Sequence, residues 1–388
     1  MRGVLWLSWR AVCARPLISA LLVLCVGVSI ALPLTTTVLL ERFEASLRAR
    51  AASTPLIVGP DVSRFDLVFA GLYFREADIA SVPRALASDA RRPGLTVIPL
   101  RLDTTARTHP VVGTDDAYYA HRNLSTRAGE LPFLLGEAAL GAGVARQTGL
   151  GVGDTLVTDP PDGLNLAASS PIELTIVGVL APTGTPDDGA VFTTLPTAWL
   201  AEGVLHGHTD ARSVEGEENV IGSTERHVAL SGAVPTARRV DDENRASFHY
   251  HADPDGLPLT ALIVVPESDK DETIALARLD ALEGVRALRS REVVDELLLT
   301  VLRIKSALDT VSALFIATTG ALLVLIFWLT ARLRADETRT IRDIGAARGT
   351  AVLLFICEGA YILFAGLVTG AALAWSTVAI AQRMLVWV

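Results

Sequence analysis

Two long apolar runs, residues 306–330 and 351–380, lie near the end of this 388-residue chain and flank a short polar segment, residues 331–350. Each run is long enough to cross a bilayer, because about 20 residues at a rise of about 1.5 Å span its hydrocarbon core. The segment between them contains five arginines and is too short to form a domain. Its length and charge are those expected of a cationic loop that a cytoplasmic partner binds.

A third apolar run, residues 16–40, follows the N-terminal segment 1–15, which contains three arginines. A signal peptide is one interpretation of this run. However, its 25 residues without a charge exceed the usual apolar region of a signal peptide, and no cleavage site of small residues closes it. We therefore expect three transmembrane helices, one N-terminal and two C-terminal, and a short tail at 381–388.

Residues 41–305 form one large hydrophilic insert, with 38 acidic and 25 basic residues. This acidic balance argues against nucleic-acid binding, which requires a basic surface. By the positive-inside rule the arginine-rich loop 331–350 and residues 1–15 are cytoplasmic, so the insert is expected outside the membrane. It contains no cysteine, but it is long enough to bury a core without disulfides.

The insert is predicted to be an α+β domain with two parts. Strand–helix–strand patterns at both ends of the insert suggest one α+β subdomain, residues 55–102 plus 258–290. Its expected strands are 56–59, 95–102, 259–265 and 285–288, and its expected helices are 76–90 and 271–282. Residues 103–257 are richer in Gly, Pro, Thr and Val and are expected to be mostly β structure. Within them we expect a helix at 137–150, strands at 155–158 and 174–180, and a loop at 213–244.

Three stretches of the sequence resemble one known family. The first is Thr-Ile-Arg-Asp-Ile-Gly-Ala at 340–346, followed by Glu358-Gly359. The second comprises Ala-Leu-Gly-Ala-Gly-Val-Ala at 139–145, Gly-Leu-Gly-Val-Gly-Asp at 149–154 and Ile-Val-Gly-Val-Leu at 176–180. The third is Leu-Ala-Pro-Thr-Gly-Thr-Pro-Asp-Asp at 180–188, followed by Val191-Phe192. In their order and spacing they resemble the MacB/FtsX-like permeases of ABC transporters, over nearly the whole chain.

The resemblance implies a multi-pass protein of the cytoplasmic (inner) membrane that works as a homodimer, or as a heterodimer with another permease. It also implies a pair of cytoplasmic ABC ATPase subunits. ATP and Mg²⁺ would bind to those partners, because this chain has no Gly-Lys-Ser/Thr phosphate loop and no cofactor of its own. The outer domain would act on an envelope substrate or a periplasmic partner, as in lipoprotein release, efflux or control of cell-wall hydrolases.

Such permeases normally have a fourth span, whereas this sequence stops at Val388, just after the third apolar run. Three interpretations are open: a natural shortening, an incomplete chain, and a span that another subunit supplies.

The main hypothesis for a functional site is that the segment 331–350 contains a helix that couples the chain to the ATPase. Ile341 and Ile344 can fill an apolar groove of the ATPase, and charged neighbours can contact the rim of that groove. These neighbours are Arg339, Arg342 and Asp343. Gly345 permits the turn back into the membrane. The alternative is that the arginines only set the topology and bind lipid headgroups.

Three residues of the last apolar run are candidates for helix packing in the membrane. Glu358 is costly if it faces lipid, so it should face protein or reach the interface. Gly366 and Gly370 form a Gly-x-x-x-Gly pattern that permits close helix approach, although the pattern also arises by chance in a chain with 30 glycines.

The loop at 181–188 is expected to be rigid and to form a turn, because proline fixes φ and glycine allows a positive φ. Its candidate residues are Pro182, Thr183, Gly184, Thr185, Pro186 and Asp188. Contact with an extracytoplasmic partner and a purely structural corner are equally open interpretations.

Two His-x-His pairs could chelate a metal if each lies on a strand, because residues i and i+2 point the same way. They are His206 with His208, and His249 with His251. Exposed loop histidines are the simpler interpretation, and we assign no metal site. No motif of a hydrolase or metalloprotease is present, so we expect no enzyme activity in this chain.

The sequence therefore predicts a permease subunit that couples ATP hydrolysis by a partner to movement of an extracytoplasmic domain. One alternative is a regulatory transmembrane scaffold that controls an envelope hydrolase or binding protein without moving cargo. A metal-responsive component, resting on the histidine pairs, is another.

Overall fold

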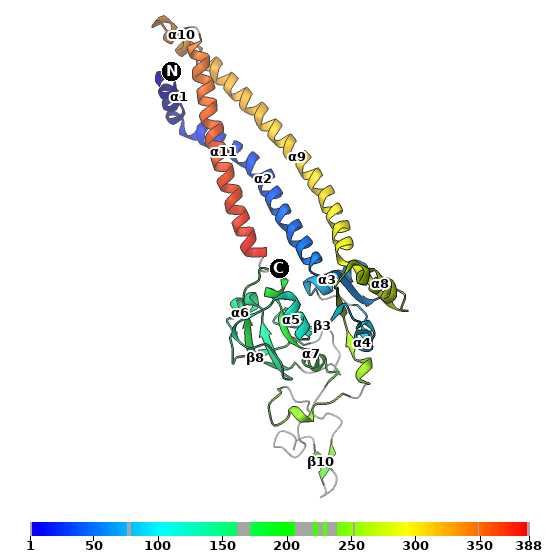
Figure 1. Cartoon of the computed structure of the whole chain (residues 1–388). Coiled ribbons are helices and arrows are strands. Elements are labelled where there is room, and N and C mark those ends of the chain that lie inside the picture. The colour runs from blue at the N-terminus through cyan, green and yellow to red at the C-terminus, as the bar shows by residue number, and fades with distance from the viewer. Residues whose placement is uncertain are drawn as a thin grey trace. The chain divides into compact units, whose positions relative to one another are not determined.

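The computed structural model describes residues 2–75, 79–160, 171–205, 220–223, 228–230, 239–250, 253–347 and 349–385. The chain forms two compact units. The membrane unit comprises Met1–Ala45 and Leu297–Leu385, and the extracytoplasmic unit comprises Ser46–Glu296. Helices α2 (Pro16–Ala52) and α9 (Ser290–Leu333) are each continuous across the boundary between the two sets of residues (Figure 1).

In the described residues the membrane unit consists of helices joined by short turns. It contains α1 (Arg2–Ala14), most of α2 and α9, α10 (Ala335–Asp343) and α11 (Thr350–Leu385). Within the described part of the chain, three helices are long and apolar enough to cross a membrane: Pro16–Ala52, Ser290–Leu333 and Thr350–Ala381. They contain the three apolar runs of the sequence, and the predicted fold class is confirmed.

These helices pack through small and polar contacts as well as apolar ones. The Ser8 hydroxyl of α1 donates to the carbonyl oxygen of Leu354 in α11 at 3.1 Å. In the same pair of helices the rings of Trp9 and Tyr361 lie 5.6 Å apart. Helix α2 meets α9 through the hydroxyls of Ser29 and Thr319, 2.9 Å apart. Polar contacts of this kind hold helices together where lipid gives no hydrophobic driving force.

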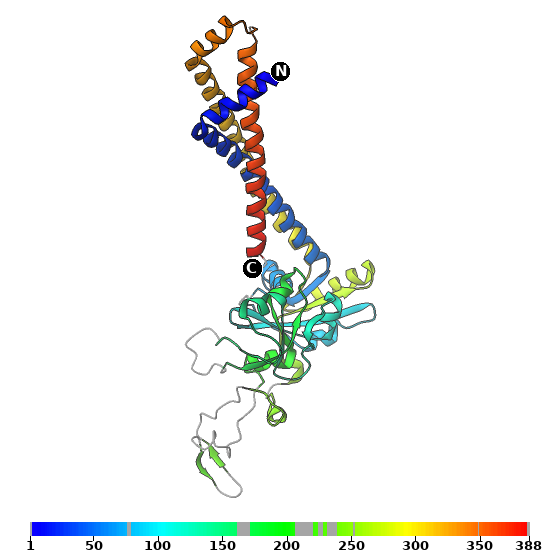
Figure 2. The ribbon, with the colours of Figure 1, turned by 90° about the vertical axis from the view of Figure 1, so that its left-hand side faces the viewer.

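The extracytoplasmic unit is built on one mixed sheet of ten strands (Figure 2). The strand order is β14-β1-β13-β3-β4-β9-β6-β8-β5, and β7 also pairs with β8. The pairs β4–β9 and β6–β8 are parallel and the others are antiparallel. The strands are β1 (Leu56–Pro60), β3 (Leu95–Ala106), β4 (His109–Thr114), β5 (Thr126–Gly129), β6 (Glu137–Leu140), β7 (Thr155–Val157), β8 (Glu173–Leu180), β9 (Val191–Thr194), β13 (Ala261–Pro266) and β14 (Val285–Arg289).

Strand β3 joins the two ends of this sheet. Its first half pairs with β13 and its second half with β4, and the register shifts between Arg101 and Thr104. Strands β1, β13 and β14, from the two flanks of the insert, are neighbours on one side of β3. The central strands lie on its other side.

Helices cover both faces of the sheet, because its buried strands are apolar on both sides. In β13, Leu262 and Val264 belong to one core cluster and Ile263 to the other. The first cluster also receives side chains of α4 (Ala85–Ala90), α6 (Ala142–Thr148), α7 (Leu195–Ala201) and α8 (Asp269–Asp280). The second receives α3 (Arg64–Tyr73) and α5 (Asp116–Arg122). Successive strand residues point to opposite faces, so one strand serves both cores.

Shorter elements complete the unit. They are β2 (Val82–Pro83), which pairs with β12 (Pro258–Leu259), and β10 (Val220–Ser223), which pairs with β11 (Val228–Leu230). The 3₁₀ turns are Pro186–Gly189, Arg245–Ser247 and Pro254–Gly256.

Three local predictions were wrong in part. The helix expected at 76–90 is reduced to α4, and β2 precedes it; residues 76–78 are outside those described. The helix expected at 137–150 is split into β6 and α6, because the buried Ala-rich residues 138–140 pair with strands β8 and β9. This tertiary pairing overrides the helical propensity of alanine. The loop expected at 213–244 includes the β10–β11 pair, and much of its remainder is outside the described residues.

Candidate functional site

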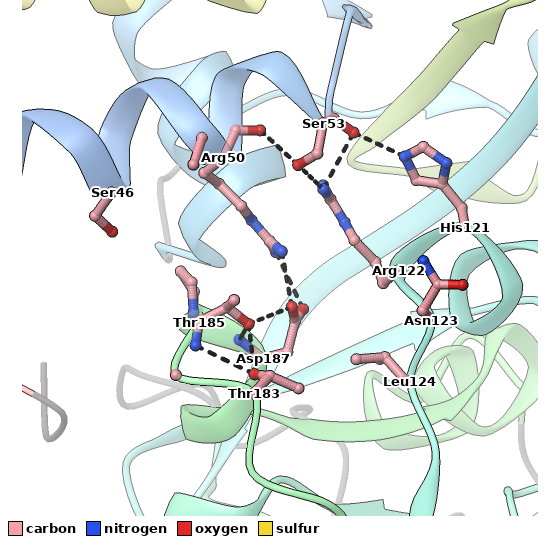
Figure 3. Close-up of a pocket in the computed structure, with 13 residues that line it drawn as sticks. Ser46, Arg50, Ser53, His121, Arg122, Asn123, Leu124, Thr183, Thr185 and Asp187 are labelled. Carbon is pink, nitrogen blue, oxygen red and sulfur yellow. Dashed lines mark hydrogen bonds and ion pairs between the residues drawn. The ribbon is translucent and has the colours of Figure 1, made fainter.

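The last turns of α2, residues 46–52, belong to the extracytoplasmic unit, and Arg50 anchors them there. The side chain of Arg50 is 5% exposed. Its Nη1 donates to Asp187 Oδ2 at 2.7 Å and its Nη2 to Asp187 Oδ1 at 3.0 Å, a bidentate ion pair. Its Nε donates to the carbonyl oxygen of Leu72, at 2.9 Å, near the end of α3. Figure 3 shows the guanidinium pointing toward the Asp187 carboxylate.

Every oxygen of the buried Asp187 carboxylate has a donor. The Tyr118 hydroxyl donates to Oδ1 and the Thr185 hydroxyl donates to Oδ2, the latter at 2.7 Å. Burial by itself raises the pKa of Asp187, but the charge of Arg50 and these hydrogen bonds outweigh burial and lower the pKa below its ordinary value. The carboxylate is therefore ionised at neutral pH, and it fixes α2, α5 and the loop before β9 to one another.

The loop that carries Asp187 is held by its own hydrogen bonds. Asp188 Oδ1 accepts from the backbone nitrogen of Thr183 at 2.8 Å, and Oδ2 accepts from that of Gly184 at 2.9 Å. Gly184 has a φ of 69°, a conformation that glycine adopts without strain. Asp187 and Asp188 are buried, whereas residues 182–185 are exposed. Of the predicted loop residues, Asp188 is thus a structural residue and the exposed tip is the part that a partner can reach.

Two glycines, Gly141 between β6 and α6 and Gly143 in α6, allow this loop to approach the sheet closely. A Cβ atom on Gly141 would lie 2.4 Å from the carbonyl oxygen of Asp187, and one on Gly143 would lie 2.6 Å from that of Asp188. Side chains at either position would push the loop away and displace the Asp187 carboxylate from Arg50. The Gly-x-Gly at 141–143 belongs to one of the stretches that carry the family resemblance. By letting the loop approach closely, it helps to place Asp187 against Arg50.

Two basic side chains at the end of α5 cap the C-terminus of α2. His121 Nε2 donates to the Ser53 carbonyl oxygen at 2.7 Å, and Arg122 Nη1 donates to the same oxygen at 3.1 Å. Arg122 also donates to the hydroxyls of Ser53 and Thr54. The cation of Arg122 is favourable here because the carbonyl groups at a helix C-terminus carry partial negative charge. Burial lowers the pKa of His121 below its ordinary value, so its ring is neutral at pH 7.

A pocket of about 440 Å³ opens between these three elements. The end of α2, the end of α5 and the loop at 183–187 line it, and the labelled side chains in Figure 3 surround it. Hydroxyl groups, the Asn123 amide and two guanidinium groups supply its polar surface.

The sequence did not single out Arg50, Tyr118, Asp187 or Arg122. One signal for Arg50 was present: with Leu47 and Ala51 it lies on one helix face at i, i+3 and i+4 spacing, and that face is buried. The partner could not be read from the sequence, because Asp187 is 137 positions away.

Comparison with known proteins identifies the family. Residues 19–232 match the model of the MacB-like periplasmic core domain, and the match covers more than half of the chain. The chain belongs to the MacB/FtsX-like family of ABC transporter permeases. No curated protein sequence is significantly similar to it.

Solved structures related to this family were also found. The periplasmic region of MacB from Actinobacillus actinomycetemcomitans is 10% identical, with a TM-score of 0.36 over 63% of this chain and 92% of that one. The extracellular domain of YknZ, a noncanonical ABC-type transporter of Gram-positive bacteria, is 11% identical, with a TM-score of 0.33 over 61% of this chain and 98% of that one.

In this permease-type chain, the predicted coupling residues lie on and just after α10. Arg339 Nη1 lies 3.4 Å from Asp336 Oδ1 on the exposed helix surface. Asp343 ends α10 and is exposed; Ile344 follows it and is 82% exposed. Gly345 has a φ of 99° and turns the chain toward α11. The backbone of Ile341 and Arg342 is helical, and their side chains are outside those described.

The three packing candidates of this permease lie in α11. Glu358 is buried and accepts a hydrogen bond from Arg334 Nη1 at 3.0 Å. Arg334 is the residue just before α10. Gly366 and Gly370 face α2: a Cβ on Gly366 would lie 2.5 Å from Val26 Cγ1, and one on Gly370 would lie 2.8 Å from the Gly27 carbonyl oxygen. Small residues thus let α2 and α11 approach closely.

The described residues contain no group of three or more His, Cys, Asp or Glu side chains that could hold a metal ion. His249 is exposed, and its Nδ1 donates to the Ser247 carbonyl oxygen. His206, His208 and His251 lie outside the described residues.

Proposed function

We propose that this chain is the permease subunit of an ABC complex, in which a partner ATPase moves the extracytoplasmic domain to act on an envelope substrate. Membership of the MacB/FtsX-like family supports an ATPase partner that binds ATP and Mg²⁺, and a homodimer or heterodimer of permeases in the cytoplasmic membrane. The observation that carries the proposal is α10, a short polar helix placed between two apolar helices that are long enough to span the membrane.

A transmitting element must be tied to the helices beside it, and an ion pair supports this for the proposed coupling segment. Arg334 lies between α9 and α10, and its ion pair with Glu358 ties the start of α10 to α11. Because the guanidinium and the carboxylate are both largely shielded from water, the pair is stronger than an exposed one. A push on α10 would therefore act on both α9 and α11.

Helix α2 provides a path from the membrane to the extracytoplasmic domain. It is assigned as one helix of 37 residues that contains Pro33. Pro33 has no N–H to bond to the Ser29 carbonyl oxygen, and the residues on either side of it continue the helix. The far end of α2 is held by the Arg50–Asp187 pair and by the cap that His121 and Arg122 form. Movement of α2 would thus be delivered to the loop at 182–186, whose exposed tip is the proposed contact with the substrate or a periplasmic partner.

Co-purification from the native membrane tests the proposal. The full chain is tagged, extracted in mild detergent, and compared with Ile344→Asp, which places a charge at the exposed apolar position beside α10. We expect the wild type to retain an ABC ATPase and the variant to lose most of it. Ile274→Asp is the matched control, because Ile274 is 54% exposed on α8 of the extracytoplasmic unit. Equal ATPase recovery with all three chains, or none with the wild type, contradicts the proposal.

A further inference from the structure

The lining of the pocket at the end of α2 contains one more positive charge than negative charge; Arg50 and Asp187 are buried and Arg122 is half-buried. Arg50 and Arg122 both line it, and Asp187 is the carboxylate among its lining residues. Both carboxylate oxygens of Asp187 accept hydrogen bonds from the guanidinium of Arg50, in a bidentate ion pair. Since His121 is neutral at pH 7, the lining residues carry a net charge of about +1.

Arg122 makes no ion pair among the described residues; its half-buried guanidinium lies over the Tyr118 ring, 5.7 Å from the centroid, and feels the more distant charge of Asp187. Its described bonds go to the Ser53 carbonyl and to two hydroxyls, all of them uncharged acceptors. Its Nε is buried without an acceptor in the described part of the chain. Burial, followed by the nearby charge of Arg50, lowers the pKa of Arg122, yet a guanidinium stays protonated at neutral pH. A half-buried cation of this kind is stabilised when an anion approaches it.

The remainder of the lining suits an oxyanion. The Ser46 hydroxyl and the Asn123 amide can donate hydrogen bonds to oxygen atoms, whereas the hydroxyl protons of Thr183 and Thr185 already go to Asp188 Oδ1 and Asp187 Oδ2. A volume of about 440 Å³ falls within the range of small-molecule sites. Ala49, Leu124 and Pro186 add apolar surface that a carbon skeleton can contact.

We infer that this pocket is a binding site for an oxyanion, a phosphate or carboxylate group, with Arg122 as its charge partner. A free phosphate and an acidic side chain of a peptide share this chemistry. The bound anion lies beside the residues that hold the end of α2, namely Arg50 and the Ser53 cap. Binding is a property of this chain and needs no ATPase, so it is tested separately from the proposed transport function.

Three substitutions separate the pocket from general charge effects. Arg122→Gln removes the guanidinium. Asn123→Asp keeps the side-chain volume and adds a negative charge to the lining. Asn123 has a φ of 51°, which aspartate also tolerates, and its side chain makes no hydrogen bond within the described residues, so this variant should fold even if Arg122→Gln does not. Arg127→Gln is the control, because Arg127 is exposed on β5 and the substitution changes the net charge equally.

The test measures binding of inorganic phosphate and of triglutamate to the full chain in detergent micelles, by calorimetry at constant ionic strength. We expect the wild type and Arg127→Gln to bind at least one probe with equal affinity, and both Arg122→Gln and Asn123→Asp to weaken it by about tenfold or more. Preference for phosphate identifies a free oxyanion as the ligand, and preference for triglutamate identifies an acidic peptide. The inference is overturned if neither probe binds, or if Asn123→Asp binds as the wild type does.

Discussion

Arg50 and Arg101 are both buried arginines with a carboxylate partner, but the two carboxylates have opposite pKa shifts. Arg101 on β3 donates from Nε to Glu202 Oε1 at 2.7 Å. Burial raises the pKa of Glu202 to about 7, despite Arg101, and its Oε2 has no hydrogen-bond partner among the described residues. Asp187 has donors on both oxygens, and its pKa is lowered. At Asp187 the charge of Arg50 and the hydrogen bonds outweigh burial, whereas at Glu202 burial outweighs Arg101, and the nearby charge of Asp103 raises the pKa further.

Replacing Asp187 should be among the most destabilising single changes in the extracytoplasmic domain. Asp187→Asn leaves the buried Arg50 without its anion, which costs about 3–5 kcal/mol of unfolding free energy. The measurement is chemical unfolding of the full chain in micelles. Asp295→Asn is the control, because Asp295 is 50% exposed in its pair with Arg48 and should cost less than about 1 kcal/mol. Similar losses for both variants would contradict the assignment of Asp187 as an anchor.

The contribution of Glu202 to the unfolding free energy of the domain should fall as pH rises toward neutrality. Its pKa is about 7 in the folded protein and 4.5 as the ordinary value, so the folded state binds this proton more tightly. Its contribution is present at about pH 4.5 and is lost as pH rises to about 7, by up to about 1.4 kcal/mol per pH unit. Unfolding measured across this window should show the trend in the wild type. Glu202→Gln should flatten it, and an unchanged slope would refute it.

The sequence indicated several residues of interest, but it did not indicate which residues they contact in the fold. The cost of an acid in an apolar run pointed to Glu358, but its pairing with Arg334 depends on how α9 and α11 meet. The loop at 181–188 was predicted from its prolines and glycine, whereas the division into an exposed tip and buried Asp187 and Asp188 required the sheet beneath it. Arg50 and Asp187 were missed, because nothing local to either residue indicates the other.

At the scale of elements, apolar length and alternation predicted most of the structure. The apolar runs lie in α2, α9 and α11, and the β-branched run at 174–180 forms β8. The error at 137–150 has a physical cause: alanine and glycine are compatible with several structures, and pairing with β8 and β9 decided for a strand at 137–140. Helix packing was least accessible, since the Gly-x-x-x-Gly pattern does not name its partner helix.

Gly370→Ala should weaken the contact between α2 and α11. The added Cβ would lie 2.8 Å from the Gly27 carbonyl oxygen, and backbone cannot yield as a flexible side chain can. Overpacking of this kind costs about 1–3 kcal/mol. Thermal unfolding of the full chain in micelles measures it. Gly320→Ala in α9 is the matched control, because nothing lies within 4 Å of the Cβ it would add. Equal stability of the two variants would mean that Gly370 is not a close contact.

At the scale of the whole molecule, the sequence predicted an α+β membrane protein of the MacB/FtsX-like family, and both the fold class and the family are confirmed. Composition and the three apolar runs were sufficient for the class of membrane protein, because membrane spans and a large acidic insert leave few architectures open. The family was predicted from the resemblance of three stretches of sequence, at 340–346, 139–180 and 180–192. The way in which α2 is anchored in the outer domain could not be predicted, since it brings together α2, α3, α5 and the loop before β9.

The central claim is that the nucleotide state of a cytoplasmic partner ATPase changes the conformation of the extracytoplasmic end of α2. Hydrogen exchange of the purified complex, with a non-hydrolysable ATP analogue and without nucleotide, tests this claim most directly. We predict that the nucleotide changes amide exchange in residues 46–54 and 181–190, and that Asp187→Asn reduces this change while the ATPase still binds. Identical exchange throughout the extracytoplasmic unit in both nucleotide states would contradict the account.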